Sequence, residues 1–351
     1  MKFLLLTIVM LSLFTSQSFS QEVKLVPPPG NGIYHGVMAG WGMHGDSVNS
    51  QRVKNYISAA GKDVAVVYFG QNWFDGIKFP AKEANDIYHN TGAIPFISLL
   101  PRSSYNQWHR DSIFYFERIL NGDFDKELTQ WANDAKNSGI PMMLDFAPEM
   151  NGSWFPWSGQ YNFYDGNIHT AGRMYRDTYR HIVDIFRKAG CKNITWAFHP
   201  NCGGTSHGAW NKMKRYYPGD DYIDWIGISV YGSQRIGDRW LEIIDNFDLF
   251  YDEMAEVSSV KPLALFEFGV TEDKDKGDKS QWIQDVFDFV QEEQYSRIKL
   301  ISYWNQNFPI YQNNKIITYS LMAIDTSPEV VYVFRENINK NIFISKPILS
   351  R

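Results

Sequence analysis

Cysteine is scarce in this sequence of 351 residues, which contains only Cys191 and Cys202. The two cysteines flank an apolar run over 193–199 that is typical of a β-strand. An extended run of that length would hold its ends roughly 20 Å apart, whereas a disulfide needs Cα atoms within about 7 Å of each other. We therefore predict two free thiols and exclude a disulfide framework as the source of stability.

Long hydrophobic runs are also few, and the one pronounced run lies at the N-terminus. Residues 3–14 are mostly apolar, follow Lys2, and are too few to span a membrane. Ser18 and Ser20 are the small residues that typically precede a cleavage site. We interpret residues 1–20 as a secretory signal, and we expect the mature chain to be secreted or periplasmic and to have no membrane span.

The sequence also lacks a strong excess of charge of one sign, since the formal net charge is −5 at pH 7. Such a balance gives no general electrostatic basis for binding nucleic acid or an anionic membrane. It suits a neutral polymer better. We expect a polysaccharide substrate, no nucleic-acid or membrane partner, and a monomer.

Motifs of cofactor and metal chemistry are missing as well. The glycines after the first apolar run do not match dinucleotide-binding spacing, and the sequence has no His-x-His or His-Glu-x-x-His pair. The acidic segment 272–279 is interleaved with lysines, which indicates a solvated loop instead of a calcium site. We expect no metal and no cofactor.

Apolar runs alternate with amphipathic stretches from end to end, which predicts an α/β fold. The runs are short and rich in Ile, Val and Phe, as strands covered on both faces are. The predicted strands are 33–39, 64–69, 93–100, 141–147, 194–198, 223–230, 263–268 and 298–304. The predicted helices are 47–60, 81–90, 124–137, 172–188, 239–257 and 280–293.

Eight strands that alternate with helices favour a (β/α)8 TIM barrel formed by a single domain over 21–351. A doubly wound open sheet is the structural alternative. The basic tail from about residue 336 is expected to be peripheral.

Two glutamates stand where predicted strands end. Glu149 closes the run 140–149, and Glu267 closes a later run. Pro148 marks the end of the hydrogen-bond ladder, and its ring is expected to push Ala147 toward extended geometry. Active sites of α/β barrels form at the C-terminal ends of the strands. A pair of carboxylates there is what glycoside hydrolysis requires, one as acid and one as nucleophile or base.

The segment 149–157, Glu-Met-Asn-Gly-Ser-Trp-Phe-Pro-Trp, resembles the strand-four signature of glycoside hydrolase family 26. The sequence around Glu267 is similar to the family's strand seven, and 221–231 resembles its strand six, which ends in a Tyr. The resemblance implies a secreted, retaining endo-β-glycanase of clan A. It makes Glu149 the general acid/base and Glu267 the nucleophile, with their carboxyl groups about 5 to 5.5 Å apart.

These two roles require different surroundings. Apolar neighbours such as Met150 and Trp154 are expected to keep Glu149 protonated near neutral pH. A hydrogen bond from the Tyr231 hydroxyl is expected to keep Glu267 ionised.

Aromatic residues make up 16% of the chain, which contains 12 Trp. Roughly half of these rings can be assigned to the core, but flat rings above a barrel rim also serve as stacking platforms for sugars. We expect Trp154, Trp157 and Trp304 to bind substrate, with Tyr231 beside them. Asn151 is expected to shape the turn after the acid, with a sugar contact as a secondary role. Core packing for the tryptophans and a strand cap for Tyr231 are the alternatives.

Two positions depart from the family pattern and bear on the substrate. Mannanases of the family usually carry Arg four residues before the acid and His immediately before it, where this chain has Asp145 and Pro148. A proline side chain cannot hydrogen-bond a sugar hydroxyl. Both β-mannan and mixed-linkage β-1,3-1,4-glucan therefore stay candidate substrates, and His199, His207 or His35 could replace the missing contact.

A catalytically inactive carbohydrate-binding barrel is the leading alternative from another class of protein. Such a protein would keep the fold and its aromatic rim but would have lost turnover. The intact pair of Glu149 and Glu267 argues against it.

Overall fold

The computed structural model describes residues 22–40, 48–105, 108–203, 208–243, 245, 247–313 and 315–350. Parallel strands follow one another in chain order around a closed sheet, because the first strand pairs with both the second and the eighth. The barrel strands are β1 (Ile33–Met38), β2 (Val66–Asn72), β3 (Ile94–Leu100), β4 (Met142–Phe146), β5 (Ile194–Phe198), β6 (Trp225–Tyr231), β7 (Leu263–Gly269) and β8 (Ile298–Trp304). The predicted (β/α)8 barrel is confirmed, while the predicted signal 1–20 lies outside the described residues.

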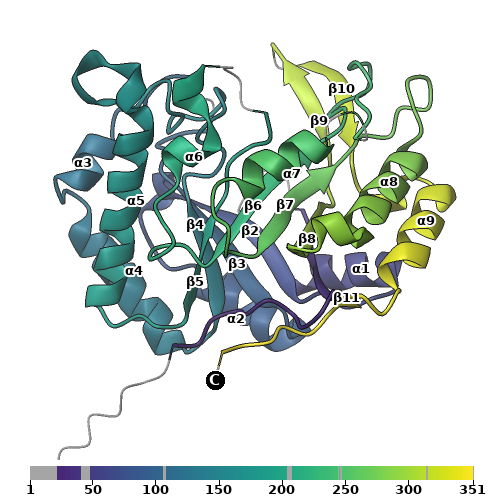
Figure 1. Ribbon diagram of the computed structural model, residues 1–351, viewed down its shortest axis with the longest axis horizontal. Helices are drawn as coiled ribbons and strands as arrows, with labels where there is room; N and C mark the ends of the chain where they lie inside the picture. Colours follow the sequence, from purple (N-terminus) through teal and green to yellow (C-terminus); the bar gives the residue numbers. More distant parts are fainter. Residues whose placement is uncertain are drawn as a thin grey trace, which may run out of the picture.

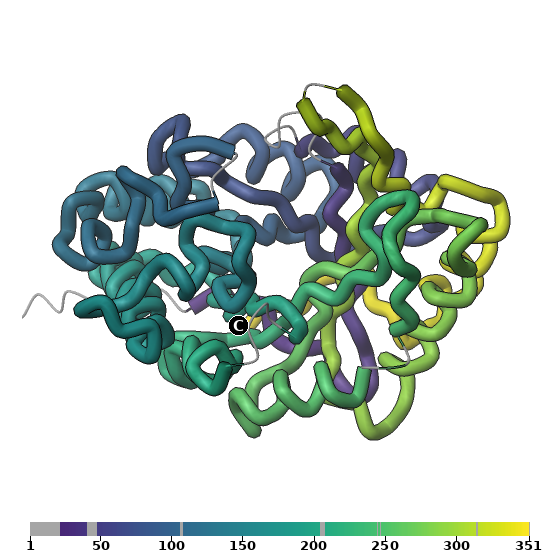
Figure 2. Tube along the Cα trace, turned by 90° about the horizontal axis from the view of Figure 1, so that it is seen from above, coloured from purple at the N-terminus to yellow at the C-terminus, as the bar shows by residue number. Residues whose placement is uncertain are grey.

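Helices cover the outside of the barrel (Figure 1), and the view from above shows the chain running around a ring (Figure 2). They are α1 (Ser50–Ala60), α2 (Ala81–Thr91), α3 (Phe116–Leu120), α4 (Asp125–Ser138), α5 (Ala171–Lys188), α6 (Met213–Tyr216), α7 (Phe247–Ala255), α8 (Lys279–Gln291) and α9 (Pro328–Ile338). α1 shows typical ends: the Asn49 side chain accepts the N–H of Arg52, and Gly61 ends the helix with φ 73°. Within the described ranges, no helix combines the length and apolar character that crossing a membrane requires.

Buried side chains form two layers, one inside the barrel and one between the sheet and the helices. Strand side chains alternate between these layers. On β1, Tyr34 and Met38 belong to the inner cluster, whereas Ile33 and Val37 belong to the outer one. The inner cluster also contains Tyr68, Phe96, Met143, Phe266 and Leu300.

An antiparallel hairpin that we did not predict follows β8 directly. It consists of β9 (Asn307–Gln312) and β10 (Lys315–Leu321), and it projects beyond the barrel (Figure 1). Most of its side chains are exposed or half-buried, so its apolar residues do not give the pattern of a covered strand.

The predicted helix over 239–257 is wrong in its first half, because α7 begins only at Phe247. The chain before α7 forms a loop held by tertiary hydrogen bonds. The Ser233 hydroxyl donates to the Arg239 carbonyl at 2.7 Å, and the Ile236 N–H donates to the Tyr319 carbonyl of β10 at 2.9 Å. These bonds replace the backbone bonds that a helix would make.

The tail from residue 336, which we expected to be peripheral, packs against the end of the barrel where β1 begins. Phe343 is buried in the core, and β11 (Phe343–Ile344) pairs in parallel with the start of β1. The two ends of the described chain meet there, since Leu25 bridges Leu349 (Figure 1). The segment thus packs against the barrel instead of lying apart from it.

Candidate active site

Glu149 and Glu267 line one cavity at the C-terminal ends of the barrel strands. Glu149 follows β4, and Glu267 lies within β7. Each residue is 8% exposed, and both line a cavity of about 470 Å³. Folding therefore brings two carboxyl groups, distant in sequence, into one space that a ligand can enter.

The turn that carries Glu149 has an unusual backbone. Ala147 and Glu149 have φ values of 50° and 55°, in the left-handed region that side chains other than glycine rarely adopt. The prediction of extended geometry for Ala147 before Pro148 is therefore wrong. Hydrogen bonds to both neighbouring strands hold the turn instead: Ala147 N–H donates to the Leu99 carbonyl at 3.0 Å, and Glu149 N–H donates to the His199 carbonyl at 2.6 Å.

Two N–H donors fix the carboxyl group of Glu149. The Trp154 indole N–H donates to Oε2 at 2.7 Å, and the Asn201 amide donates to Oε1 at 3.1 Å. Trp154 is thus a polar partner of the carboxyl group, whereas we expected an apolar one, and Met150 is buried in the core. We did not predict Asn201, although its place just after β5 at the catalytic end of the barrel is a usable signal.

A glycine makes room for the Trp154 ring. A Cβ atom added to Gly152 would lie 2.6 Å from that ring, closer than real contacts allow. A side chain at this position would therefore displace the ring. The pairing of Gly152 with Trp154 positions the donor that holds Glu149.

Glu267 is held by two tyrosines. The predicted bond from the Tyr231 hydroxyl to Glu267 Oε2 is present at 2.5 Å. Burial and the negative charge of Glu149 raise the pKa of Glu267 to about 7. The charge of His199 and hydrogen bonds from Tyr231 and Tyr68 act in the opposite direction.

The charge of Glu149 acts on the ionisation of Glu267. Repulsion from Glu149 contributes to the raised pKa of Glu267, so a proton on Glu149 removes that repulsion and favours ionised Glu267. The hydrogen bonds from Tyr231 and Tyr68 favour the same form. The hydrogen bonds therefore act against the burial that raises the pKa of Glu267.

Aromatic side chains surround the pair. Trp154 and Trp304 line the cavity, and the Trp304 ring meets Tyr231 edge-on with centroids 6.0 Å apart. Trp108, which we did not predict, lines the same cavity and is largely exposed. The described site thus offers flat apolar faces next to its acids, as sugar binding requires.

Two residues predicted to bind substrate are placed elsewhere. Trp157 is only 1% exposed, stacks on Phe155 with centroids 4.4 Å apart, and donates its indole N–H to the Pro148 carbonyl at 2.7 Å. Asn151 is buried, and its side chain exchanges two hydrogen bonds of 2.8 Å with the backbone of Asn201. Both residues therefore stabilise the turn, and neither lines the cavity.

Of the histidines considered as replacement sugar contacts, the two that the structure describes do not line the cavity. His199 and His35 are both buried, and His207 lies outside the described residues. His199 hydrogen-bonds Asp145 through Nδ1 at 2.7 Å and Ser229 through Nε2 at 2.9 Å. Across the described part of the chain, no cluster of three or more His, Cys, Asp or Glu could hold a metal ion.

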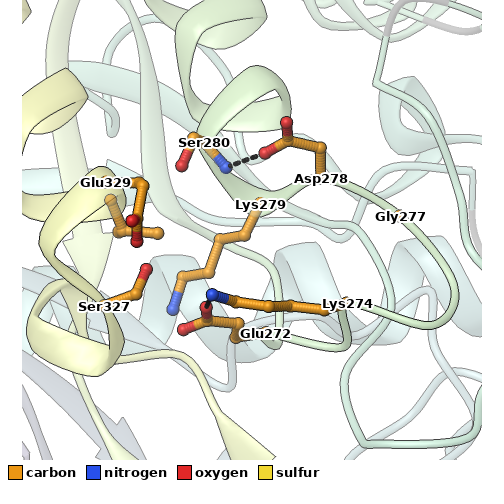
Figure 3. A pocket seen from close by; sticks show the side chains of 9 residues that line it. Glu272, Lys274, Gly277, Asp278, Lys279, Ser280, Ser327 and Glu329 are labelled. Carbon is orange, nitrogen blue, oxygen red and sulfur yellow. Dashed lines mark hydrogen bonds and ion pairs between the residues drawn. The ribbon is translucent and has the colours of Figure 1, made fainter.

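A separate cavity of about 340 Å³ lies between the β7–α8 loop and the start of α9 (Figure 3). Lys279 reaches through it, and its ammonium group donates to the carbonyls of Leu321 and Ala323 and to the Thr326 hydroxyl at 2.7 to 3.0 Å. Burial lowers the pKa of Lys279 to about 7. We assign Lys279 a structural role, because its three acceptors tie α8 to the segment after β10.

Comparison with known proteins supports the same assignment of fold. A family model described as glycosyl hydrolase family 26 matches residues 109–311. Endoglucanase H of Acetivibrio thermocellus is 28% identical over 297 residues, which are 84% of this chain and 29% of that protein. A mannan endo-1,4-beta-mannosidase of Bifidobacterium adolescentis is 29% identical over 165 residues, which are 44% of this chain and 15% of that protein. The chain thus spans less than a third of the length of these two curated relatives.

Solved structures share the barrel. The catalytic domain of a GH26 endo-beta-1,4-mannanase from Bacillus sp. JAMB-750 has a TM-score of 0.62 at 22% identity, over 89% of this chain and 87% of that chain. A modular endo-beta-1,4-mannanase from Cellulomonas fimi has a TM-score of 0.61 at 20% identity, over 89% of this chain and 72% of that chain. At these identities the likeness concerns the fold alone.

Proposed function

Because the chain belongs to glycosyl hydrolase family 26, we propose that it is a secreted, retaining endo-β-glycanase that cleaves β-1,4 linkages in a plant-type polysaccharide. The shared cavity of Glu149 and Glu267, each held by its own donors, is the observation that carries the proposal. Trp154 and Trp304 in that cavity offer the faces on which sugar rings stack. Export rests on the signal proposed for residues 1–20.

Hydrolysis takes place in two displacements. Glu149 donates its proton to the glycosidic oxygen while Glu267 attacks the anomeric carbon, so the glycosidic bond breaks and a glycosyl ester forms. Glu149 then takes a proton from water, whose oxygen attacks the same carbon and releases Glu267. Two inversions give a product with retained configuration. Tyr231 holds the Glu267 oxygen that its hydroxyl contacts at 2.5 Å.

A second cavity supports internal cleavage of a polymer. It has a volume of about 520 Å³ and shares Trp304 with the catalytic cavity. Gly40 and Arg52 line it from one side, and Pro309 and Tyr311 of the hairpin line it from the other. A sugar chain bound at the glutamates has room to continue past Trp304, which an enzyme that removes single terminal units does not need.

Mixed-linkage β-1,3-1,4-glucan is favoured over β-mannan as the substrate. Pro148 offers no side-chain hydrogen bond to the sugar, and neither His199 nor His35 replaces it, because both are buried. The match to a relative named as an endoglucanase also covers 84% of the chain, against 44% for the mannosidase of Bifidobacterium adolescentis.

Release of reducing ends tests the proposal. Purified protein is incubated with barley β-glucan, glucomannan and galactomannan, and new reducing ends are measured over time. We expect the fastest release from β-glucan, and NMR of the first products should show the β-anomer. Faster release from galactomannan would reverse the substrate order. Binding to these polymers with no new ends from any of them would favour the inactive carbohydrate-binding barrel.

A further inference from the structure

A chain of buried polar groups crosses the interior of the barrel next to the glutamate pair. Asp145 on β4, His199 after β5 and Ser229 on β6 are joined by hydrogen bonds of 2.7 and 2.9 Å through the two ring nitrogens of His199. All three residues are 0% exposed. Ser229 is the register partner of Glu267 on β7, and the His199 carbonyl accepts the N–H of Glu149. These hydrogen-bonded side chains therefore link the strands that carry the acid and the nucleophile.

His199 is surrounded by negative groups. Burial alone would lower the pKa of His199, but the hydrogen bond and charge of Asp145, together with the charges of Glu267 and Glu149, raise it above its ordinary value. Burial raises the pKa of Asp145 as well. The charges of Asp145, Glu267 and Glu149 all favour the imidazolium form of His199.

The other titratable groups around this network stay neutral. Burial raises the pKa of each of them, and the nearby carboxylates raise it further. These groups are Tyr68 on β2, Tyr175 and Tyr179 on α5, Cys202 after β5 and Tyr231 on β6. The charge in the barrel interior is therefore carried by Asp145, His199 and the glutamate pair.

We propose that His199 is a positioning residue whose imidazolium charge, held by Asp145 and Ser229, favours the ionised form of Glu267 and sets the pH range in which the glutamate pair works. His199 lies between Asp145 of β4 and Ser229 of β6, and both hydrogen bonds are buried. The inference rests on the proposed hydrolysis by Glu149 and Glu267.

Replacing His199 by a neutral residue would change the net charge of the barrel interior. Asp145 and His199 together carry no net charge, whereas Asp145 alone carries a negative charge. That charge would raise the pKa of Glu267. The acid limb of the pH profile of kcat/KM would then move to higher pH. A purely structural role for His199 would lower the profile at every pH and leave its limbs in place.

Three variants separate these outcomes. In His199→Gln, which keeps hydrogen-bonding groups but loses the charge, the acid limb should move up by about one pH unit. Activity on that limb should then fall about tenfold. In the double variant His199→Gln/Asp145→Asn, the interior again has no net charge, so the acid limb should return to within a few tenths of a unit of the wild type. An unmoved acid limb in His199→Gln, or no return in the double variant, would overturn the proposal.

Ser229→Ala is the matched control, because it removes a partner of the ring and keeps both charges. The limbs of its pH profile should stay at the wild-type pH, even if kcat/KM is lower at every pH. Thermal unfolding of each variant shows whether a loss reflects folding. If His199→Gln does not fold, histidine 15N NMR of the wild type decides. One buried imidazole should stay doubly protonated between pH 6 and 8, while that of His35 stays neutral, and two neutral buried rings would reject the proposal.

The outcomes for the inference and for the proposed function are distinct. If the wild type releases no reducing ends from any polymer, the proposed function fails, and the NMR result still reports the charge of His199. If the wild type is active and the acid limb does not move, only the role of His199 fails.

Discussion

His35 and His199 are both buried in the same barrel, yet their pKa values shift in opposite directions. His35, on the outer side of β1, donates through Nδ1 to the Asp63 carbonyl at 2.9 Å and accepts the Tyr56 hydroxyl at Nε2 at 2.8 Å. Its partners are neutral, and burial lowers the pKa of His35 to about 3. His199 is bonded to the carboxylate of Asp145, and its pKa is raised. Partners, not burial, decide whether a buried histidine is charged.

The two histidines represent two regions with different roles. The inner region at the catalytic end holds ionisable groups that contact one another, whereas the outer region packs large aromatic rings against the helices. Fully buried rings of the outer region include Trp73, Trp131, Trp282, Phe287 and Phe334. We therefore expect inner substitutions to change turnover and its pH dependence, and outer substitutions to change stability.

Glu267→Ala is the strongest test of the inner region. Loss of the nucleophile should lower kcat by about 10⁴-fold or more, because no other group can form the glycosyl ester. Unfolding temperature should change little or rise, since the variant also removes a buried carboxyl whose ionisation burial opposes. Reducing-end release and thermal unfolding measure the two effects.

Added azide provides the control for Glu267→Ala. It can attack the anomeric carbon from the vacated side, so activity should partly return with a product of inverted configuration. Activity close to that of the wild type without azide would remove Glu267 from the role of nucleophile and would erase the distinction between the two regions.

His35→Gln tests the outer region through the pH dependence of stability. Between pH 6.5, the ordinary pKa of histidine, and the folded-state value of about 3, the unfolded chain binds a proton that the folded chain excludes. Acid therefore favours unfolding, by up to about 1.4 kcal/mol per pH unit for this one group. Gln keeps both hydrogen bonds and does not titrate.

Urea unfolding at a series of pH values gives the comparison. The free energy of unfolding of the wild type should fall more steeply than that of His35→Gln as the pH decreases from 6.5. Curves that stay parallel down to pH 4 would show that His35 is not held neutral. The pH profile of kcat/KM should be the same for both proteins, in contrast to the variants at His199.

The barrel was predictable because its strands are covered on both faces and so read as continuous apolar runs. β5 and β8 were predicted to the residue, at 194–198 and 298–304. The hairpin of β9 and β10 was missed because its exposed strands lack that pattern. Helix 239–257 was over-predicted because the loop before α7 depends on bonds to β10, which local sequence does not reveal.

The site was predictable only in part, for a related reason. Glu149 and Glu267 were found because each follows or ends an apolar run, which places it at the catalytic rim. The segment 149–157 does not reveal that Trp154 faces the cavity while Trp157 and Asn151 face the core. Contacts such as that of Asn201 with Glu149 join residues that follow separate strands. They can be identified only when the folded barrel is known, and not from the local sequence.

Trp154→Phe and Trp157→Phe compare the inner region with the outer region within a single turn. Each removes one indole N–H, but Trp154 donates to the Glu149 carboxyl and Trp157 to the Pro148 carbonyl. We expect Trp154→Phe to lower kcat/KM by about ten- to a hundredfold, the value of a hydrogen bond to a charged group. Trp157→Phe should cost about 1 to 2 kcal/mol of stability and change kcat/KM by less than about threefold.

Steady-state kinetics and urea unfolding on both variants give the result. Equal losses of activity would mean that the indole of Trp157 acts on the acid through the turn. Equal losses of stability would mean that the bond of Trp154 holds the turn more than it holds the carboxyl group.

Tyr311→Ala tests the smallest effect, at the edge of the inner region. Tyr311 is largely exposed on β9 and lines the cavity beyond Trp304. One stacked ring contributes about 0.5 to 1.5 kcal/mol, so KM for a long polysaccharide should rise about two- to tenfold while kcat stays nearly constant. Ile317→Ala is the matched control, because Ile317 is equally exposed on β10 but does not line that cavity. A short oligosaccharide that fills only the catalytic cavity should not distinguish the two variants; an equal rise in its KM would place Tyr311 at the catalytic centre instead of along the path of the polymer.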